Sequence, residues 1–96
     1  MLARESIQLI DVRQPEERQA GRIAGDRHVE LVQLTGEAAS ISRHQPVVFY
    51  CRSGARSAMA TEAFRQAGYD AHNMVGGLLA WQSAGLPLDP PDSRVA

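Results

Sequence analysis

Cys51 is the only cysteine in the sequence, and its neighbours are of the kind that make a thiol reactive. It follows an apolar run of strand length and opens a short loop that contains Gly54. Gly54 lets the loop backbone curl so that successive amides face inward, and the helix expected next directs its positive end to the same point. Arg52 and Arg56 stay charged at ordinary pH and are expected on either side of the pocket. These features favour the thiolate and predict a pKa for Cys51 below the free value of about 8.5.

A buried cysteine can also be an inert, small hydrophobic residue. The position of Cys51 at a strand end, before a loop with two arginines, favours the reactive role. Either arginine can also be a surface residue, and Arg52 can face a structural carboxylate, so Arg56 is the stronger ligand candidate. The residues therefore predict Cys51 as a nucleophile, and the same loop donors can hold an incoming oxyanion.

The elements that position this loop alternate between strands and helices. Apolar runs predict strands at 7–12, 28–31, 46–50 and 71–75. Helices are predicted at 16–20, weakly at 32–45, after the Cys51 loop up to Gly68, and at 78–83. This alternation implies a small, mostly parallel sheet flanked by helices in three layers, with ligands bound at the carboxyl ends of the strands. The Cys51 loop lies at such an end.

Helical spacing also predicts which side chains are buried. The weak helix is expected to bury five: Val32, Leu34, Ala38, Ala39 and Ile41. The helix after the loop is expected to bury four: Ala60, Ala63, Phe64 and Ala67.

Four motifs in this order resemble a single-domain rhodanese, a thiosulfate sulfurtransferase. They are IDVRQPEE, GRIAG, CRSGARS and GGLLAW, and the resemblance covers residues 9–88. It implies a rhodanese-like fold and transfer of sulfane sulfur. Cys51 would take sulfur from a small anion such as thiosulfate, become a persulfide, and pass the sulfur to cyanide, a thiol or a protein acceptor.

The resemblance implies that Cys51 is the catalytic residue and that the loop supplies the persulfide cradle and the substrate-binding anion site: Arg52, Ser53, Gly54, Ala55 and Arg56. It also assigns roles to residues outside the loop. Asp11 and Arg13 match the family's Asp-Val-Arg signature and are interpreted as structural support for the strand end beneath the loop. Glu17 matches a family acid and is interpreted as structural. Gly76 and Gly77 would let the backbone approach the site closely. Trp81 is expected to pack.

The chain departs from the family pattern outside the loop. Arg18 stands where the family usually has an aromatic residue, Arg22 replaces a histidine, Asp26 a small residue and Glu30 a proline. Residues 1–6 leave little room for the family's usual first strand and helix. Either the sheet lacks that N-terminal edge strand, or the chain is a trimmed or fused module. An uncovered edge would favour weak self-association, so a monomer or weak dimer is expected.

Composition limits the other functions. The chain has 96 residues and net charge −1, which indicates one globular domain, assigned to 1–88 with a flexible tail at 89–96. All ten basic residues are arginines scattered among acids, so no nucleic-acid partner is predicted. No apolar run is long enough to span a membrane, and the single cysteine suits a reducing cytoplasm. No cofactor is implied, and the spacing of His28, His44, His72 and Cys51 offers no metal site.

Two rival functions remain open. Cysteine phosphatases and arsenate reductases also use a thiolate in an amide-lined loop, but their arginine lies six positions after the cysteine. Here Arg56 lies five positions after Cys51, a shorter loop that suits a persulfide better than a phosphate. The other rival is a sulfur-carrier or regulatory module that uses the same loop to dock a partner.

Overall fold

The computed structural model describes residues 7–96, which fold around a sheet of four parallel strands. The strands are β1 (Gln8–Asp11), β2 (Arg27–His28), β3 (Val47–Tyr50) and β4 (Ala71–Asn73), in the order β2-β1-β3-β4. The predicted parallel α/β sheet is confirmed. The question of an N-terminal edge strand concerns residues 1–6, which lie outside the described residues.

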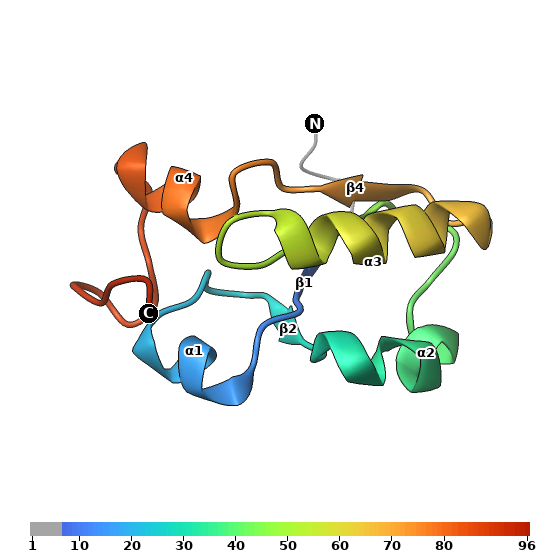
Figure 1. The fold of residues 1–96 in the computed structure, drawn as a ribbon, viewed down its shortest axis with the longest axis horizontal. Coiled ribbons are helices and arrows are strands. Elements are labelled where there is room, and N and C mark those ends of the chain that lie inside the picture. Colours follow the sequence, from blue (N-terminus) through green and yellow to red (C-terminus); the bar gives the residue numbers. More distant parts are fainter. Residues whose placement is uncertain (1–6) are drawn as a thin grey trace.

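Helices lie on both faces of this sheet. They are α1 (Pro15–Ala20), α2 (Leu34–Glu37), α3 (Ala55–Gln66) and α4 (Gly77–Ser83), with 3-10 turns at Leu31–Gln33 and Ala38–Ser40 on either side of α2. Figure 1 shows α1 and α4 on the left and α2 and α3 on the right of the molecule. The layers are therefore helix, sheet and helix, as predicted.

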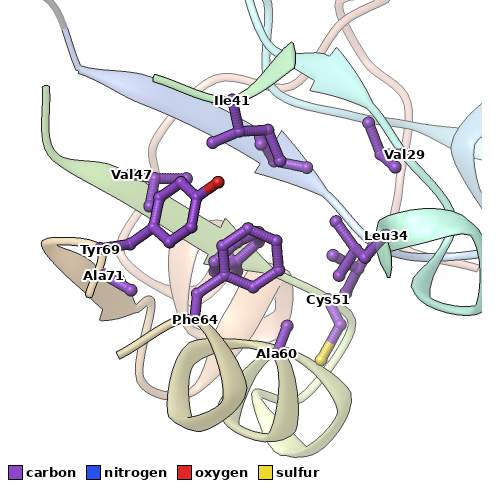
Figure 2. Close-up of a cluster of buried hydrophobic side chains, with 12 residues drawn as sticks. Val29, Leu34, Ile41, Val47, Cys51, Ala60, Phe64, Tyr69 and Ala71 are labelled. Atoms are coloured by element: carbon purple, nitrogen blue, oxygen red, sulfur yellow. The ribbon is translucent and has the colours of Figure 1, made fainter. Parts of the chain in front are cut away.

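The strands alternate their side chains between two cores. Val47 and Phe49 face the core under α2 and α3, whereas Tyr50 belongs to a second cluster with Ile23 and Leu78. In the first core, the ring of Phe64 lies 5.0 Å from that of Phe49. Figure 2 shows Cys51 at one end of this core. The catalytic candidate is therefore anchored by the same strand that carries the core.

Several predicted buried positions are wrong. Residues 31–40 form three short helical segments in place of one helix, so a single helical period does not apply, and Val32 is 83% exposed. Ala39 is exposed as well.

The buried face of α3 also differs from the prediction. Ala63 and Ala67 are exposed, and the residues that α3 buries are Ser57, Ala60, Thr61 and Phe64. The hydroxyls of this face have partners nearby, since Thr61 donates to the carbonyl oxygen of Ser57. A count of apolar residues could not identify a buried face that includes two hydroxyl side chains.

The last residues run back over the α4 side of the molecule. Arg22 and Asp89 form an isolated antiparallel bridge, and Val95 packs against the second cluster together with Trp81. Flexibility of residues 89–96 stays a prediction. Within residues 7–96, no helix is both long and apolar enough to cross a membrane.

Candidate active site

Cys51 directly follows strand β3 with its side chain fully buried, and its sulfur lies inside a ring of hydrogen-bond donors. The amide of Gly54 donates to Sγ at 3.1 Å and the amide of Ser57 at 3.4 Å. The Ser57 hydroxyl oxygen also lies 3.4 Å from Sγ. The loop therefore presents several donors to one sulfur atom.

These donors affect the charge of the thiol. Burial by itself raises the pKa of Cys51, because it disfavours the thiolate. The Ser57 hydroxyl and the amides of Ser57, Gly54 and Ser53 together outweigh burial, so the net effect is to lower the pKa. Cys51 is thus more readily ionised than an ordinary cysteine.

The loop is held in this shape by the start of α4. The amide of Leu78 donates to the carbonyl oxygen of Cys51 at 2.9 Å, and the amide of Leu79 donates to that of Arg52 at 3.0 Å. These bonds pull the loop carbonyls toward α4, which leaves the amides free to face the sulfur.

Two glycines allow the loops to approach each other. Gly77 has φ +58°, and a Cβ there would lie 2.6 Å from the carbonyl oxygens of both Cys51 and Arg52. Gly54 adopts φ +102° at the start of α3, a conformation that side-chain-bearing residues rarely adopt. The expected close approach of the backbone at Gly77 is confirmed.

The two loop arginines are both engaged elsewhere. Arg56 makes two hydrogen bonds to Glu17 of α1, at 2.7 and 2.9 Å. Arg52 is exposed, and its Nε donates to the carbonyl oxygen of Ala96 at 2.8 Å. Their roles in substrate binding stay predictions, as do those of Ser53 and Ala55.

Asp11 and Arg13 form a buried ion pair at the end of β1. Arg13 Nε donates to Asp11 Oδ1 at 2.9 Å, and Arg13 also donates to the carbonyl oxygen of Gly21 at 2.7 Å. One guanidinium nitrogen, Nη1, has no hydrogen-bond partner among the described residues, but the guanidinium lies over the ring of Tyr50, 5.6 Å from its centre. The pair thus fixes β1 against the strand that Cys51 directly follows.

Arg18 and Asp26, two residues that depart from the family pattern, belong to a second polar cluster. Arg18 binds Asp26 with two hydrogen bonds, at 2.8 and 2.6 Å, and the hydroxyl of Tyr50 donates to Asp26 at 2.5 Å. Burial and the bond to Asp26 raise the pKa of Tyr50, which keeps its hydroxyl protonated. The replacements at positions 18 and 26 therefore compensate each other.

The sequence predictions missed two residues: Ser57, which contacts the sulfur, and Asn73, which bonds to Ser57. Ser57 lies inside the CRSGARS motif, six positions after Cys51 at the start of the predicted helix, and this position could have identified it as a site residue. Asn73 lies on β4 and bonds to Ser57 at 2.6 Å, a contact for which the sequence offers no local signal. Among residues 7–96, no three histidine, cysteine or acidic side chains gather in a way that could hold a metal ion.

Comparison with known proteins places this chain in a family. The family model described as Rhodanese-like domain matches residues 1–84. The "Sulfurtransferase" of Allochromatium vinosum is 36% identical over 92% of this chain and 83% of that protein. The "HTH-type transcriptional regulator Rv0324" of Mycobacterium tuberculosis is 38% identical over 86% of this chain, which spans only 38% of that longer protein.

Solved structures agree with this assignment. The crystal structure of a rhodanese-related protein from Thermoplasma volcanium superposes with a TM-score of 0.81 and is 29% identical, with 85% of this chain and 82% of that chain covered. A rhodanese-like domain protein from Staphylococcus aureus gives a TM-score of 0.78 at 30% identity, over 83% of this chain and 78% of that one. With its thiol loop at the end of β3 and the family model matched over most of its length, the chain belongs to the rhodanese-like domain family, which includes proteins named as sulfurtransferases.

Proposed function

We propose that this protein is a sulfurtransferase that carries sulfane sulfur as a persulfide on Cys51. The observation that carries the proposal is the sulfur of Cys51, which directly follows a strand and lies inside a ring of inward-facing amides. Such a ring stabilises a thiolate, and it can equally hold the terminal sulfur of a persulfide anion. Membership of a family that includes named sulfurtransferases supports the same reaction.

The reaction has two half-reactions. The Cys51 thiolate attacks the outer sulfur of thiosulfate, or of a persulfide donor. A Cys51–sulfur bond forms while the donor's own sulfur–sulfur bond breaks, and that electron pair leaves with sulfite or with the donor thiolate. A thiophilic acceptor, cyanide or a thiol, then attacks the outer sulfur, and the bonding pair returns to Cys51 as thiolate. One substrate therefore leaves before the second reacts, so ping-pong kinetics are expected.

We also propose roles for other residues of the loop and of the first turn of α3. Gly54 and Ser57 donate to the reacting sulfur through their amides. Arg56 contributes positive charge at the start of α3, although Glu17 balances that charge. We propose no cofactor, and the reducing cytoplasm as the setting in which Cys51 stays a thiol.

Intact-protein mass tests the proposal directly. After brief exposure to thiosulfate, or to glutathione persulfide, the protein is expected to gain the mass of one sulfur atom. Cyanide should remove that sulfur and form thiocyanate. The control is Cys51→Ser, which should gain nothing. A protein that gains no sulfur from either donor, or gains it equally with Cys51→Ser, contradicts the proposal.

A sulfur-carrier or regulatory module is the second candidate. The observation that favours it is the relative named as a transcriptional regulator, of which the matched segment is only a part. A carrier would accept sulfur from a protein persulfide but turn thiosulfate over poorly. Robust thiosulfate turnover would favour the enzyme. Hydrolysis of an aryl phosphate or reduction of arsenate would instead favour the phosphatase-like alternative.

A further inference from the structure

Asn73 lies directly behind the Cys51 loop and shares a hydroxyl group with the catalytic sulfur. Its Oδ1 lies 2.6 Å from the Ser57 hydroxyl oxygen, and that oxygen lies 3.4 Å from Cys51 Sγ. Cys51 and Ser57 are both fully buried, so water does not compete for the contact between them, and Asn73 is half-buried. The three side chains form a line from β4, through the first turn of α3, to the end of β3.

The orientation of the Asn73 amide is fixed by its other end. Asn73 Nδ2 donates to the carbonyl oxygen of Gly54 at 3.3 Å. Because that partner accepts only, the nitrogen faces Gly54, and Oδ1 must face Ser57.

The Ser57 hydroxyl has one proton and two neighbours that can accept it. While Cys51 is a thiol, the shorter contact to Asn73 Oδ1 takes the proton, and the Ser57 oxygen accepts from the S–H group. When Cys51 ionises, the sulfur becomes the stronger acceptor, and the hydroxyl must turn away from Asn73 to donate to it. The Ser57 hydroxyl can therefore stabilise the thiolate only when its hydrogen bond to Asn73 is broken.

We infer that Asn73 is a positioning residue of the sulfur-transfer site: it holds the Ser57 hydroxyl proton away from the resting thiol and yields it to the sulfur when Cys51 ionises. It thereby restrains the formation of the nucleophile without touching substrate. The inference rests on the proposed function only in taking Cys51 as the nucleophile.

Other charged groups near the loop have partners of their own. Arg56 of α3 pairs with Glu17 of α1, and Arg13 pairs with Asp11 at the end of β1. On β4 the nearest titratable group is His72, which is half-exposed and pairs with Asp70, and α4 carries none. No hydrogen bond within residues 7–96 joins these groups to Ser57 or Asn73, so the effect of Asn73 can be separated from theirs.

Titration of the thiol tests the inference through a double-mutant cycle. The thiolate is followed by its ultraviolet absorbance, after subtraction of the signal of Cys51→Ser, and no sulfur donor is needed. Asn73→Leu frees the Ser57 hydroxyl and should lower the pKa of Cys51 by about half to one unit, the scale of a hydrogen bond to a charged group shared between two acceptors. Ser57→Ala should raise it. Asn73→Leu in the Ser57→Ala background should then have no effect.

Two results would overturn the inference. One is a pKa that stays constant or rises in Asn73→Leu. The other is an equal shift in both backgrounds, which would mean that Asn73 acts through Gly54 and not through Ser57. His72→Leu, on the same strand but with a half-exposed side chain, is the matched control and should leave the pKa unchanged.

Asn73→Asp provides a second test that preserves the shape of the side chain. A carboxylate holds the Ser57 proton more strongly than an amide, so the pKa should rise more in the Ser57 background than in the Ser57→Ala background. Equal rises would contradict the inference. A failed cycle with normal sulfur gain would refute the role of Asn73 alone, whereas a successful cycle without sulfur gain would refute the proposed function alone.

Discussion

Glu17 and Arg56 form an ion pair with two hydrogen bonds that ties α1 to the first turn of α3, although 39 residues separate them in the sequence. The ion pair therefore connects the helix that follows β1 to the loop that carries Cys51. The side chain of Glu17 is 18% exposed and that of Arg56 is 35% exposed, so the pair lies at the edge of the solvent. It both fixes the start of α3 and neutralises the positive charge of Arg56.

The pair predicts a loss of stability in acid. The hydrogen bond from Arg56 lowers the pKa of Glu17 from 4.5 to about 2. A carboxylate with a lowered pKa stabilises the fold above its unfolded pKa, and that stability disappears as the pH falls from about 4.5 toward 2. Glu17→Gln should lower the free energy of unfolding at pH 7 by on the order of 1 kcal/mol, after allowance for solvent screening. Urea unfolding across this pH range should show the difference from wild type shrinking in acid.

The neighbouring Glu16 provides the matched control, because its side chain is exposed. Glu16→Gln should leave the pH dependence as in wild type. A Glu17→Gln protein that loses stability in acid as steeply as wild type would contradict the role given to the pair.

The two loop arginines are expected to differ in their effect on activity. Arg56→Ala removes the positive charge at the start of α3 and leaves the Glu17 carboxylate unpaired, which would repel an anionic donor at the proposed site. We expect it to lower kcat/KM for thiosulfate by about tenfold or more, the scale of one charge-assisted hydrogen bond. Arg52→Ala should change it by less than about threefold, a free-energy change below 1 kcal/mol, because Arg52 is exposed and bonded to Ala96. Equal losses in the two variants would show that the site uses both charges.

Alanine variants at Gly77 and Gly85 distinguish the unfolding free energy lost to a strained backbone from that lost to steric crowding. Both have positive φ, +58° and +79°, but a Cβ at Gly77 would meet two backbone oxygens at 2.6 Å, whereas a Cβ at Gly85 would have nothing within 4 Å. Gly85→Ala should cost about 1 kcal/mol of unfolding free energy, and Gly77→Ala more than about 2 kcal/mol. Gly77→Ala should also reduce sulfur transfer, because it displaces the Cys51 loop. Similar unfolding free energies for the two variants would contradict the close packing of the loops.

Arg18 and Asp26 should show coupled effects on stability. Asp26→Ala removes the acceptor of the Tyr50 hydroxyl and leaves Arg18 with only its 3.2 Å bond to Asp11, and it should cost about 2–4 kcal/mol. The double variant Arg18→Phe with Asp26→Ala follows the family pattern of an aromatic and a small residue, and should lose less than the two single changes added together. Denaturant unfolding measures the coupling, and strictly additive losses would count against it. Arg27→Ala, which removes an exposed pair with Glu37 and two exposed hydrogen bonds to Ser40, is the control and should cost below about 1 kcal/mol.

The sequence was most informative where structure depends on near neighbours. Strand β3, the loop after it and the helix α3 were predictable because an apolar run, a glycine and a capped helix follow one another within some 20 residues. The ion pair of Glu17 with Arg56 and the bond of Ser57 with Asn73 join separate elements, and spacing along the chain gives no signal for either. The burial of Thr61 was missed for another reason: its hydroxyl is satisfied within its own helix, so a polar residue occupies an apolar face at little cost.

Helix α4 has consequences for the dynamics of the site. It has seven residues, of which only Gly77 and Leu78 are buried, and short helices with little buried surface open more easily than the sheet beneath them. Its first-turn amides are nevertheless the ones that hold the carbonyls of Cys51 and Arg52. When α4 opens, the sheet can stay folded while the amides around the sulfur lose their arrangement. Local fluctuation of α4 would thus limit the fraction of time in which Cys51 is ready to react, and heat would inactivate the protein before it unfolds it.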